Sequence, residues 1–285
     1  MHMPEIYDLH CHSTASDGAL SPAELVHRAK EFGVTSLALT DHDTVAGLKE
    51  AQNEADLSAI RLIPGIELST SWKNKCFHIV GLGINPAFPA LAEATRNLQI
   101  MRFERAQKIA DKLEKKGISG AMEAVNNAVG PEGMITRSHF ADFLLAHCHV
   151  STQQEAFDRY LGAGKPAYAP TLWAEMEQAI QWITESGGVA VLAHPLRYKL
   201  TGSWINRLLS AFKEVGGAGI EVVTGRYNKD EIHVVANYAR RYDLAGSVGS
   251  DFHSPDLQWV ELGRLAPLPE NIKPIWELLH LPENL

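Results

Sequence analysis

The sequence predicts an α/β protein whose mostly parallel sheet is closed, or nearly closed, into a barrel. Two observations support this fold class. Apolar and β-branched runs alternate with helical patterns in both end regions of the chain, which is typical of parallel strands covered by helices. Between Pro86 and Pro170 the pattern changes to helices alone, which indicates an insert. The 285 residues, 45% of them hydrophobic, can form one large domain that carries such an insert.

The first helix shows how the elements are delimited. Ser21 and Glu24 form a capping box with Pro22 at the first helical position, and Gly33 ends the helix. Thr44 is expected to cap the next helix. Similar signals predict strands over 6–12, 34–40, 61–68, 76–83, 188–193, 218–223 and 244–248, and helices over 44–56, 173–186, 203–215 and 228–242.

The insert is expected to contain helices over 89–116, 137–147 and 153–161. We therefore divide the chain into three parts. Residues 1–86 form the first part of the barrel, residues 87–167 form a helical insert for substrate recognition, and residues 168–285 form the second part of the barrel.

Composition excludes several classes of protein. The net charge of −8 disfavours binding to long duplex nucleic acid, but it allows a small anionic substrate where positive charge is concentrated locally. The apolar runs are too short for a membrane span, and the first residues do not resemble a signal peptide. We expect a cytoplasmic monomer without membrane contact. Its three widely spaced cysteines disfavour a disulfide framework and a thiolate zinc site.

Histidines and acidic residues follow the predicted strands. His10 and His12 share one face of an extended segment, while Cys11 points away. A lone histidine is more often an ordinary structural residue, but the strand ends of a barrel meet at one rim, where catalytic groups gather. The residues that would meet there are His10, His12, Asp17, His42, Glu67, His78, His194, Asp251 and His253.

His78 begins its strand, whereas the other histidines follow strand ends. A hairpin accounts for this difference, because Glu67 and His78 are equally far from a turn centred on Trp72 and Lys73. With that register, the two side chains would face each other directly across an antiparallel pair. Otherwise His78 would be a hydrogen-bonded core residue.

These six imidazoles and three carboxylates are too many ligands for a single ion. Imidazole and carboxylate without thiolate suit Mn, Fe or Zn better than Mg or Ca. Asp41 and Asp43 are expected to support the ligands or to cap the helix that follows. Three divalent ions facing three carboxylates would leave a net positive centre, and such a centre attracts phosphate.

The motif series resembles that of the PHP (polymerase and histidinol phosphatase) family of metallophosphoesterases. The motifs are His10-Cys11-His12, Asp17-Gly18, residues 40–43, residues 65–67, His78, residues 193–195 and residues 249–253. The resemblance implies a distorted (β/α)7 barrel with three divalent ions, Mn first and Fe or Zn next, that hold the attacking water. It assigns the ions to three ligand sets: His10, His12, Glu67 and Asp251; Glu67, His78 and His194; Asp17, His42 and His253.

The insert resembles that of one PHP subgroup in residues 102–106, 135–141 and 160–168, with Ser138 where an Arg-Pro-His triplet would have proline. This resemblance implies hydrolysis of the 3′-phosphate of 3′,5′-nucleoside bisphosphates, with 5′-to-3′ exoribonuclease action on short RNA in some members. Two alternatives stay open. One is a histidinol phosphatase or another small-molecule phosphomonoesterase, and the other is a metal-binding protein without turnover.

Arginines of the insert are candidates for binding a substrate 5′-phosphate. Arg102 and Arg105 share one helix face, and Arg137 opens the next helix, where free N–H groups favour an anion. Guanidinium groups bind phosphate bidentately. The alternative is an ordinary solvated helix face. The full predicted substrate set is Asp17, His42, Arg102, Arg105, Arg137, His139 and Lys165.

Overall fold

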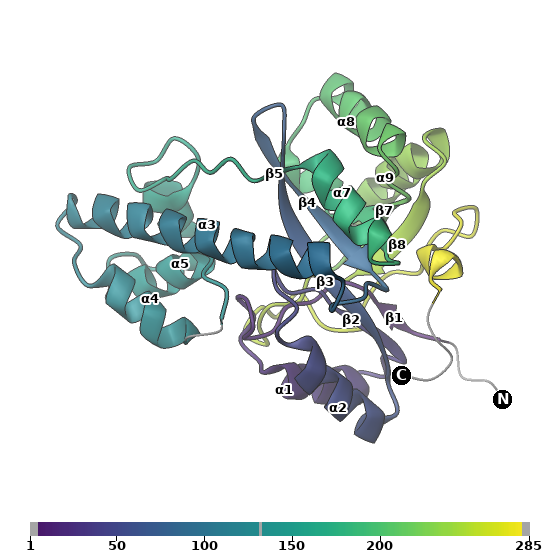
Figure 1. The fold of residues 1–285 in the computed structure, drawn as a ribbon, viewed down its shortest axis with the longest axis horizontal. Coiled ribbons are helices and arrows are strands. Elements are labelled where there is room, and N and C mark those ends of the chain that lie inside the picture. The colour runs from purple at the N-terminus through teal and green to yellow at the C-terminus, as the bar shows by residue number, and fades with distance from the viewer. Residues whose placement is uncertain (1–4, 131–132, 281–285) are drawn as a thin grey trace.

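The computed structural model describes residues 5–130 and 133–280, in which seven strands form a barrel (Figure 1). Their order is β1 (Tyr7–Asp8), β2 (Ser36–Leu39), β3 (Arg61–Trp72), β4 (Lys75–Leu82), β6 (Val189–Leu192), β7 (Gly219–Thr224) and β8 (Ala245–Gly249). Backbone hydrogen bonds from Leu9 N to Val248 O (3.0 Å) and from Asp251 N to His10 O (2.8 Å) connect the last strand to the first. The predicted α/β barrel is confirmed.

Antiparallel pairing distorts the barrel at β4. This strand runs antiparallel to both β3 and β6, whereas the other neighbours in the barrel pair in parallel. The reversal occurs because β3 and β4 form a hairpin, in which Lys73 and Asn74 both have positive φ (48° and 61°). A turn of this kind needs only two residues. No crossover helix is therefore needed between these two strands.

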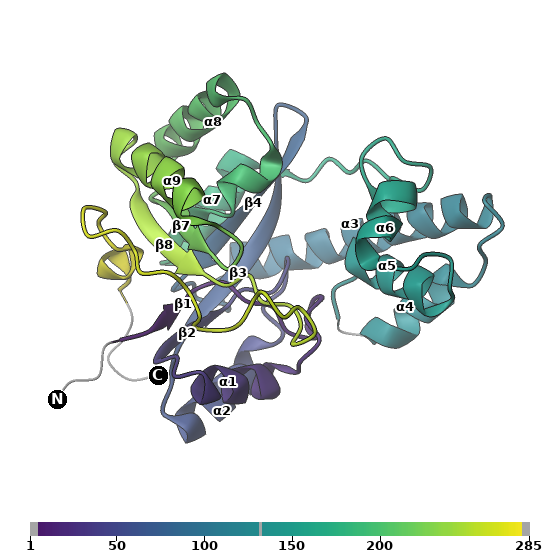
Figure 2. The same ribbon diagram turned by 180° about the vertical axis from the view of Figure 1, so that it is seen from behind.

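Helices cover the outside of the barrel (Figures 1 and 2). They are α1 (Pro22–Glu31), α2 (Leu48–Ser58), α7 (Met176–Glu185), α8 (Gly202–Glu214) and α9 (Lys229–Arg241). The buried face of α1, with Leu25 and Val26, packs with Leu37 and Leu39 of β2. The capping box at the start of α1 forms as predicted, since Ser21 Oγ accepts a hydrogen bond from the Glu24 amide (3.2 Å).

The insert has its own hydrophobic core. Its helices are α3 (Pro89–Glu114), α4 (Ala121–Val129), α5 (Arg137–Ala146) and α6 (Gln153–Ala156), followed by a π-helical turn over Phe157–Leu161. Leu113, Val125, Phe140 and Leu144 belong to one buried cluster within these helices. Figure 1 shows α3 extending from the barrel along the insert. The prediction missed α4. The residue boundaries of the three parts stay a prediction.

Two predicted elements around the rim begin or end elsewhere. β1 ends at Asp8, so His10 and His12 follow the strand instead of lying within it. α2 begins at Leu48 with Gly47 as its N-cap. Thr44 forms a local turn instead, in which its hydroxyl accepts a hydrogen bond from the Ala46 amide (3.1 Å). The expectation that Thr44 caps this helix is therefore wrong.

α7 also begins later than predicted. Ala174 and Glu175 form a short strand, β5, that pairs with Thr70 and Ser71 of β3, and the helix begins only at Met176. This pairing brings the chain back to the barrel after the insert. No helix in the described residues is long and apolar enough to cross a membrane.

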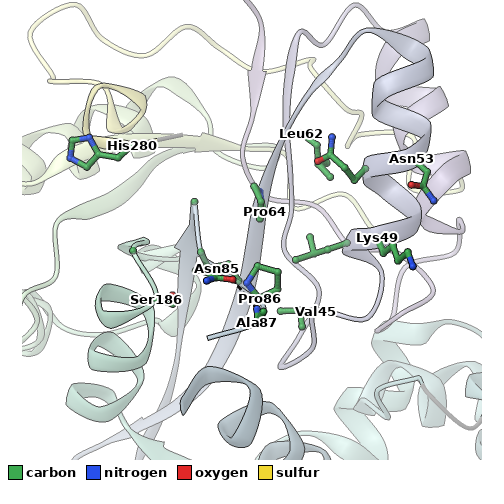
Figure 3. Close-up of a pocket in the computed structure, with 15 residues that line it drawn as sticks. Val45, Lys49, Asn53, Leu62, Pro64, Asn85, Pro86, Ala87, Ser186 and His280 are labelled. Carbon is green, nitrogen blue, oxygen red and sulfur yellow. Dashed lines mark hydrogen bonds between the residues drawn. The ribbon is translucent and has the colours of Figure 1, made fainter. Parts of the chain in front are cut away.

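A cavity of about 840 Å³ lies where β3 begins and β4 ends, next to α2 (Figure 3). Its lining is mostly apolar and includes Val45, Leu48, Leu62 and Ile84. The histidines and acidic residues predicted for the rim do not line it. The predicted chemistry therefore belongs to the opposite end of the parallel strands.

Candidate metal centre

The two histidines that follow β1 converge on one point. Cys11 forms a parallel bridge with Phe252, and its thiol points into the core, where it donates a hydrogen bond to Ala38 O (3.2 Å). His10 and His12 face the other way, and their Nε2 atoms lie 3.2 Å apart in a buried environment. Two imidazole nitrogens so placed can bind one metal ion.

Glu67 lies at the centre of the cluster. Its side chain is 1% exposed. Oε2 lies 3.3 Å from Nε2 of both His10 and His12. The same oxygen lies 2.9 Å from Nδ1 of His42, which follows β2. One carboxylate oxygen thus faces three imidazoles from two different segments.

The other oxygen of Glu67 faces a second group of imidazoles. Oε1 lies 2.9 Å from Nδ1 of His78 on β4 and 3.0 Å from Nε2 of His194, which follows β6. Because each oxygen has its own set of ring nitrogens, the geometry suits a carboxylate shared between two metal ions.

The hairpin places His78 differently from the prediction. Glu67 pairs with Val80, and His78 pairs with Ser69, because the turn is centred one residue later than expected. The expectation that Glu67 and His78 stand directly opposite each other is wrong. Their side chains still meet, because diagonal neighbours on one face of a sheet lie within reach of long side chains.

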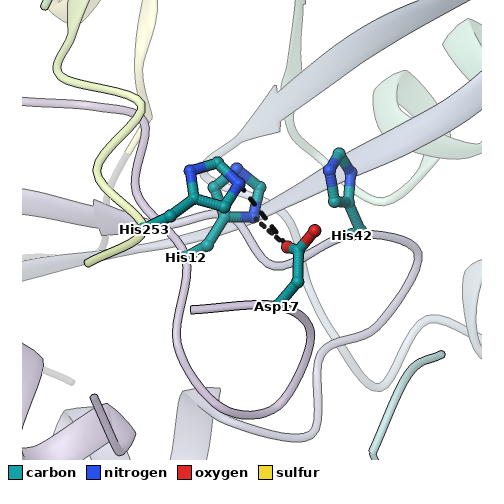
Figure 4. Close-up of side chains that lie close together, drawn as sticks. All are labelled: His12, Asp17, His42 and His253. Carbon is teal, nitrogen blue, oxygen red and sulfur yellow. Dashed lines mark ion pairs between the residues drawn. The ribbon is translucent and has the colours of Figure 1, made fainter. Parts of the chain in front are cut away.

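A second carboxylate, Asp17, lies among further histidines. Figure 4 shows it with His12, His42 and His253, whose candidate ligand atoms all lie within 4.8 Å of one another. Asp17 Oδ1 is 3.5 Å from His253 Nε2 and 3.9 Å from His12 Nδ1. These distances leave room for a cation between the groups.

Asp251 completes the predicted set from the loop after β8. Its Oδ1 lies 3.6 Å from His10 Nε2 and 3.4 Å from His12 Nε2. Oδ2 accepts a hydrogen bond from Arg197, a residue that the prediction missed. Asp251 and His194 have φ values of 54° and 30°, in the left-handed region. Strained backbone of this kind is often found at functional sites.

The donor atoms themselves support metal binding. His42 Nδ1 and Glu67 Oε2 are 2.9 Å apart and buried, yet neither makes a hydrogen bond among the described residues. His194 Nδ1 is a third buried nitrogen without a hydrogen-bond partner there. Buried polar atoms are rarely left unpaired. Divalent ions would satisfy these buried donor atoms, so the residues fit such groups.

Electrostatics favour the ionised carboxylate of Glu67 and the neutral ring of His42, which are the forms that bind a metal. Burial raises the pKa of Glu67, but the imidazoles of His42, His78 and His10, when protonated, outweigh it and hold that pKa well below its usual range. Burial lowers the pKa of His42 to about 4, despite the opposing effect of Glu67. At neutral pH Glu67 is therefore a carboxylate and His42 a neutral ring.

Glu221 on β7 also belongs to the centre, although the prediction missed it. It is buried, and its Oε1 accepts a hydrogen bond from His10 Nδ1 (2.9 Å). Its Oε2 accepts from the His194 amide (2.6 Å). One carboxylate thereby orients two predicted ligands. The signal in the sequence was a glutamate inside an otherwise apolar strand.

Asp41 and Asp43 support the centre without capping α2. Asp41 accepts hydrogen bonds from the amide (2.8 Å) and hydroxyl (2.7 Å) of Ser13 and from the hydroxyl of Ser16 (2.6 Å). These bonds fix the loop that carries Asp17. Asp43 accepts a hydrogen bond from the Ser69 amide (2.6 Å). The expected helix-capping role is wrong, since α2 has no side-chain cap.

Arg102 is committed to the protein and is not free for a substrate. Its Nε donates to Asp43 Oδ2 (2.7 Å), and the two remaining nitrogens donate to Ser69 Oγ (2.9 Å) and to Ile135 O (3.2 Å). The arginine is 4% exposed. These contacts attach α3 to the barrel. They leave the guanidinium group of Arg102 with little exposed surface for the predicted contact with a phosphate.

Arg105 and Arg137, in contrast, have no carboxylate within ion-pair distance among the described residues. Their guanidinium groups lie over the rings of Trp173 (5.4 Å) and Phe157 (5.6 Å). Arg105 Nε is buried without a hydrogen-bond partner. Burial and the charges of Arg137 and Arg102 lower the pKa of Arg105 to about 9, which leaves it charged at neutral pH. This pair is suited to an anion.

Of the two remaining residues predicted to bind substrate, His139 belongs to a helix cap and Lys165 lies in an exposed turn. His139 Nδ1 accepts a hydrogen bond from the Thr136 amide (3.0 Å), which closes a capping box at the start of α5. Lys165 is exposed in the turn after the π-helical segment, and its side chain makes no hydrogen bond within the described part of the chain. The structure therefore brings Arg105 and Arg137 together but leaves Lys165 outside the cluster.

Comparison with known proteins agrees with this geometry. The model of the PHP domain family matches residues 8–225. The chain is 46% identical over 275 residues to a 5′-3′ exoribonuclease of Haemophilus influenzae. The aligned region covers 96% of this chain and 99% of that protein. It is 42% identical over 272 residues to a 3′,5′-nucleoside bisphosphate phosphatase of Chromobacterium violaceum, with 95% of each chain covered.

A solved structure from Chromobacterium violaceum, described as an amidohydrolase with bound sulfate and no metal, has the same fold. It has a TM-score of 0.91 and 43% sequence identity, and 95% of each chain is covered. The predicted resemblance is therefore confirmed over nearly the whole chain, and this chain belongs to the PHP domain family.

Proposed function

We propose that the protein is a metal-dependent phosphoesterase that removes the 3′-phosphate from 3′,5′-nucleoside bisphosphates and degrades short 5′-phosphorylated RNA from its 5′ end. The observation that carries this proposal is a carboxylate, Glu67, surrounded by imidazoles, in a protein whose insert carries two arginines that have no acidic partner among the described residues. The names of the similar proteins from Haemophilus influenzae and Chromobacterium violaceum support it.

We assign three divalent ions to the centre, with Mn preferred over Fe or Zn. His10, His12, Glu67 and Asp251 would hold the first; Glu67, His78 and His194 the second; Asp17, His42 and His253 the third. Bound ions would act as Lewis acids on the phosphoryl group and favour deprotonation of the attacking water. Imidazole and carboxylate donors fit such ions, which bind the rings in their neutral form and the acids in their ionised form, with release of any proton that a ring carries.

The residues of the insert would select and orient the substrate. Arg105 and Arg137 are charged, lie against aromatic rings and have unused donors. A 5′-phosphate between them would hold the nucleotide so that its 3′-phosphate reaches the centre. Binding energy from the remote phosphate then becomes orientation at the reacting group. Arg102 acts indirectly, because it holds the helix that carries Arg105.

A substrate panel with added Mn²⁺ tests the proposal. It contains a 3′,5′-nucleoside bisphosphate, the matching nucleoside 3′-monophosphate, histidinol phosphate and a short 5′-phosphorylated RNA. We expect the bisphosphate to have the highest kcat/KM among the small molecules. A preference for histidinol phosphate would replace this proposal with the alternative phosphatase, and no hydrolysis with any metal would indicate a binding protein.

The arginine pair is tested on the same substrates with Arg137→Ala. Loss of the arginine and loss of the 5′-phosphate should each lower kcat/KM by about 10- to 100-fold, because each removes the same charged contact. The two losses of kcat/KM should not be additive, so Arg137→Ala should hardly change kcat/KM for the substrate without a 5′-phosphate. Arg96→Ala, an exposed arginine on the same helix as Arg105, is the control and should behave like the wild type. Full additivity would show that Arg137 does not contact the 5′-phosphate.

A further inference from the structure

The insert contacts the loop that carries Asp17, one of the proposed metal ligands. The Met134 amide donates a hydrogen bond to Ala15 O (3.0 Å). Near the start of α5, Ser138 Oγ donates to Asp17 Oδ2 (3.0 Å). The insert therefore reaches a carboxylate of the metal centre directly, in addition to carrying Arg105 and Arg137.

The backbone around Asp17 is already fixed without the insert. The amides of Ser16 and Gly18 both donate to Ser13 O (3.0 and 2.9 Å). A Cβ atom on Gly18 would lie only 2.1 Å from His12 O, so the loop is tightly folded. Within the loop, the Ser16 hydroxyl lies 3.5 Å from Asp17 Oδ1, at the distance limit for a hydrogen bond, so the loop itself holds the rotation of the Asp17 side chain only weakly. That rotation decides how a carboxylate oxygen faces the histidines.

The two carboxylate oxygens of Asp17 have different neighbours. Oδ1 faces His253 Nε2 (3.5 Å) and His12 Nδ1 (3.9 Å). Oδ2 accepts the hydrogen bond from Ser138. The Asp17 side chain is 4% exposed, so bulk water has little access to replace that hydroxyl. One oxygen is consequently left for a cation, in a defined orientation.

We propose that Ser138 is a positioning residue for the third ion: its hydroxyl turns Asp17 so that Oδ1 joins His42 and His253. The insert would then complete a metal site as well as select the substrate. The proposal rests on the proposed function only in that it needs a metal centre. Hydrogen bonds to ligating carboxylates typically change metal affinity by about 10- to 100-fold.

Mn²⁺ binding without any substrate tests this role. Equilibrium dialysis with metal analysis would compare the wild type with Ser138→Ala and with Ser138→Thr, which keeps the hydroxyl. We expect Ser138→Ala to bind two ions normally and the third about 10- to 100-fold more weakly. Ser138→Thr should bind all three ions much like the wild type. Ser138→Cys, which keeps the size but donates only weakly, repeats the test if the alanine variant does not fold.

Thr136→Ala is the matched control. The Thr136 hydroxyl caps the same helix by accepting from the Ser138 amide (3.1 Å), and it does not contact Asp17. Its loss should lower the melting temperature and leave Mn²⁺ affinity unchanged. Equal weakening in Thr136→Ala and Ser138→Ala would assign the effect to the position of α5 and overturn the proposal.

The two proposals fail in different ways. A wild type that binds no Mn²⁺, Fe²⁺ or Zn²⁺ would remove the proposed function together with this inference. A wild type that binds three ions, with Ser138→Ala binding all of them equally well, would remove only the role of Ser138.

Discussion

At the scale of single residues, the chemistry depends on which nitrogen of each imidazole faces the centre. Glu221 Oε1 accepts from His10 Nδ1 (2.9 Å), which places a proton on Nδ1, so Nε2 is the nitrogen that would bind a metal in the neutral ring. That Nε2 atom is the one that faces Glu67 and His12. A single buried carboxylate therefore fixes both the tautomer and the direction of a proposed ligand.

We predict that Glu221→Gln weakens metal binding without unfolding the protein. Glutamine keeps the size of the side chain, but its NH2 group must face one of the two donors, His10 Nδ1 or the His194 amide. The expected loss is about 10- to 100-fold in Mn²⁺ affinity, measured by calorimetric titration.

Glu261→Gln provides the control for losing a carboxylate. Glu261 pairs with Arg28 (2.6 Å), away from the proposed ligands. The Glu261→Gln substitution should change the melting temperature only slightly and should leave Mn²⁺ affinity unchanged. If Glu221→Gln binds Mn²⁺ as the wild type does, Glu221 does not orient a ligand.

At the scale of elements, the insert is held to the barrel by a buried ion pair. Arg102 on α3 reaches Asp43, which follows β2, with Nη2 and Oδ2 2.6 Å apart. The Arg102 guanidinium also lies 5.2 Å from the ring of Trp173. These contacts determine how the arginine pair of the insert stands relative to the metal centre.

We predict opposite roles for Arg102 and Arg105, three residues apart on α3. Arg102→Met leaves the fully buried Asp43 without its cation, which should cost about 3–5 kcal/mol of the free energy of unfolding. Arg105→Met removes a charge that has no acidic partner in the described part of the chain, so stability should stay the same or rise, while the preference for a 5′-phosphate is lost. Denaturant unfolding and kcat/KM on both nucleotide substrates measure the two effects.

The ion pair offers its own control. Asp43→Asn in the Arg102→Met background should recover part of the lost stability, because it removes the unpaired charge. No recovery would mean that Arg102 stabilises the protein through packing on Trp173 instead. Comparable destabilisation by Arg105→Met would contradict the division of roles.

At the scale of the whole molecule, the centre gathers ligands from both ends of the chain. His12 and His253 are separated by almost the entire sequence, yet the centroids of their rings lie 4.2 Å apart because β8 lies beside β1. The centre exists only when the barrel is closed. Metal ions that bind the folded state and not the unfolded state therefore stabilise the fold.

We predict that removal of metal lowers the melting temperature. A site occupied at 100 times its dissociation constant contributes about 2.7 kcal/mol. For a protein of this size that corresponds to roughly 4–5 °C for each saturated site. Calorimetry of the protein dialysed against EDTA and then against Mn²⁺ measures the shift.

The control is His194→Ala, which removes one proposed ligand of the second ion. Its stabilisation by Mn²⁺ should be smaller than that of the wild type, although its fold is retained. Identical melting temperatures with and without Mn²⁺, in the wild type, would argue against a metal centre.

The order of the strands and helices, apart from α4 and β5, and the identities of the clustered residues were predictable from the sequence. Capping boxes, alternation along a strand and the shared rim of parallel strands are properties of short segments. His10 and His12 therefore share a face as predicted, and Glu67 and His194 lie at the rim. The turn of the hairpin was predicted one residue too early, because turn residues such as Lys73 and Asn74 carry no strong signal without glycine.

The partners of charged side chains were decided only by the tertiary structure. Glu221 meets His10 across 211 positions, Ser138 meets Asp17 across 121, and Arg102 meets Asp43 across 59. Local patterns showed that arginines and carboxylates were present, but they could not show which are paired in the interior and which are left for a ligand. That distinction depends on burial and on the register of packed elements, because a buried charge must find its counter-charge wherever the fold places it.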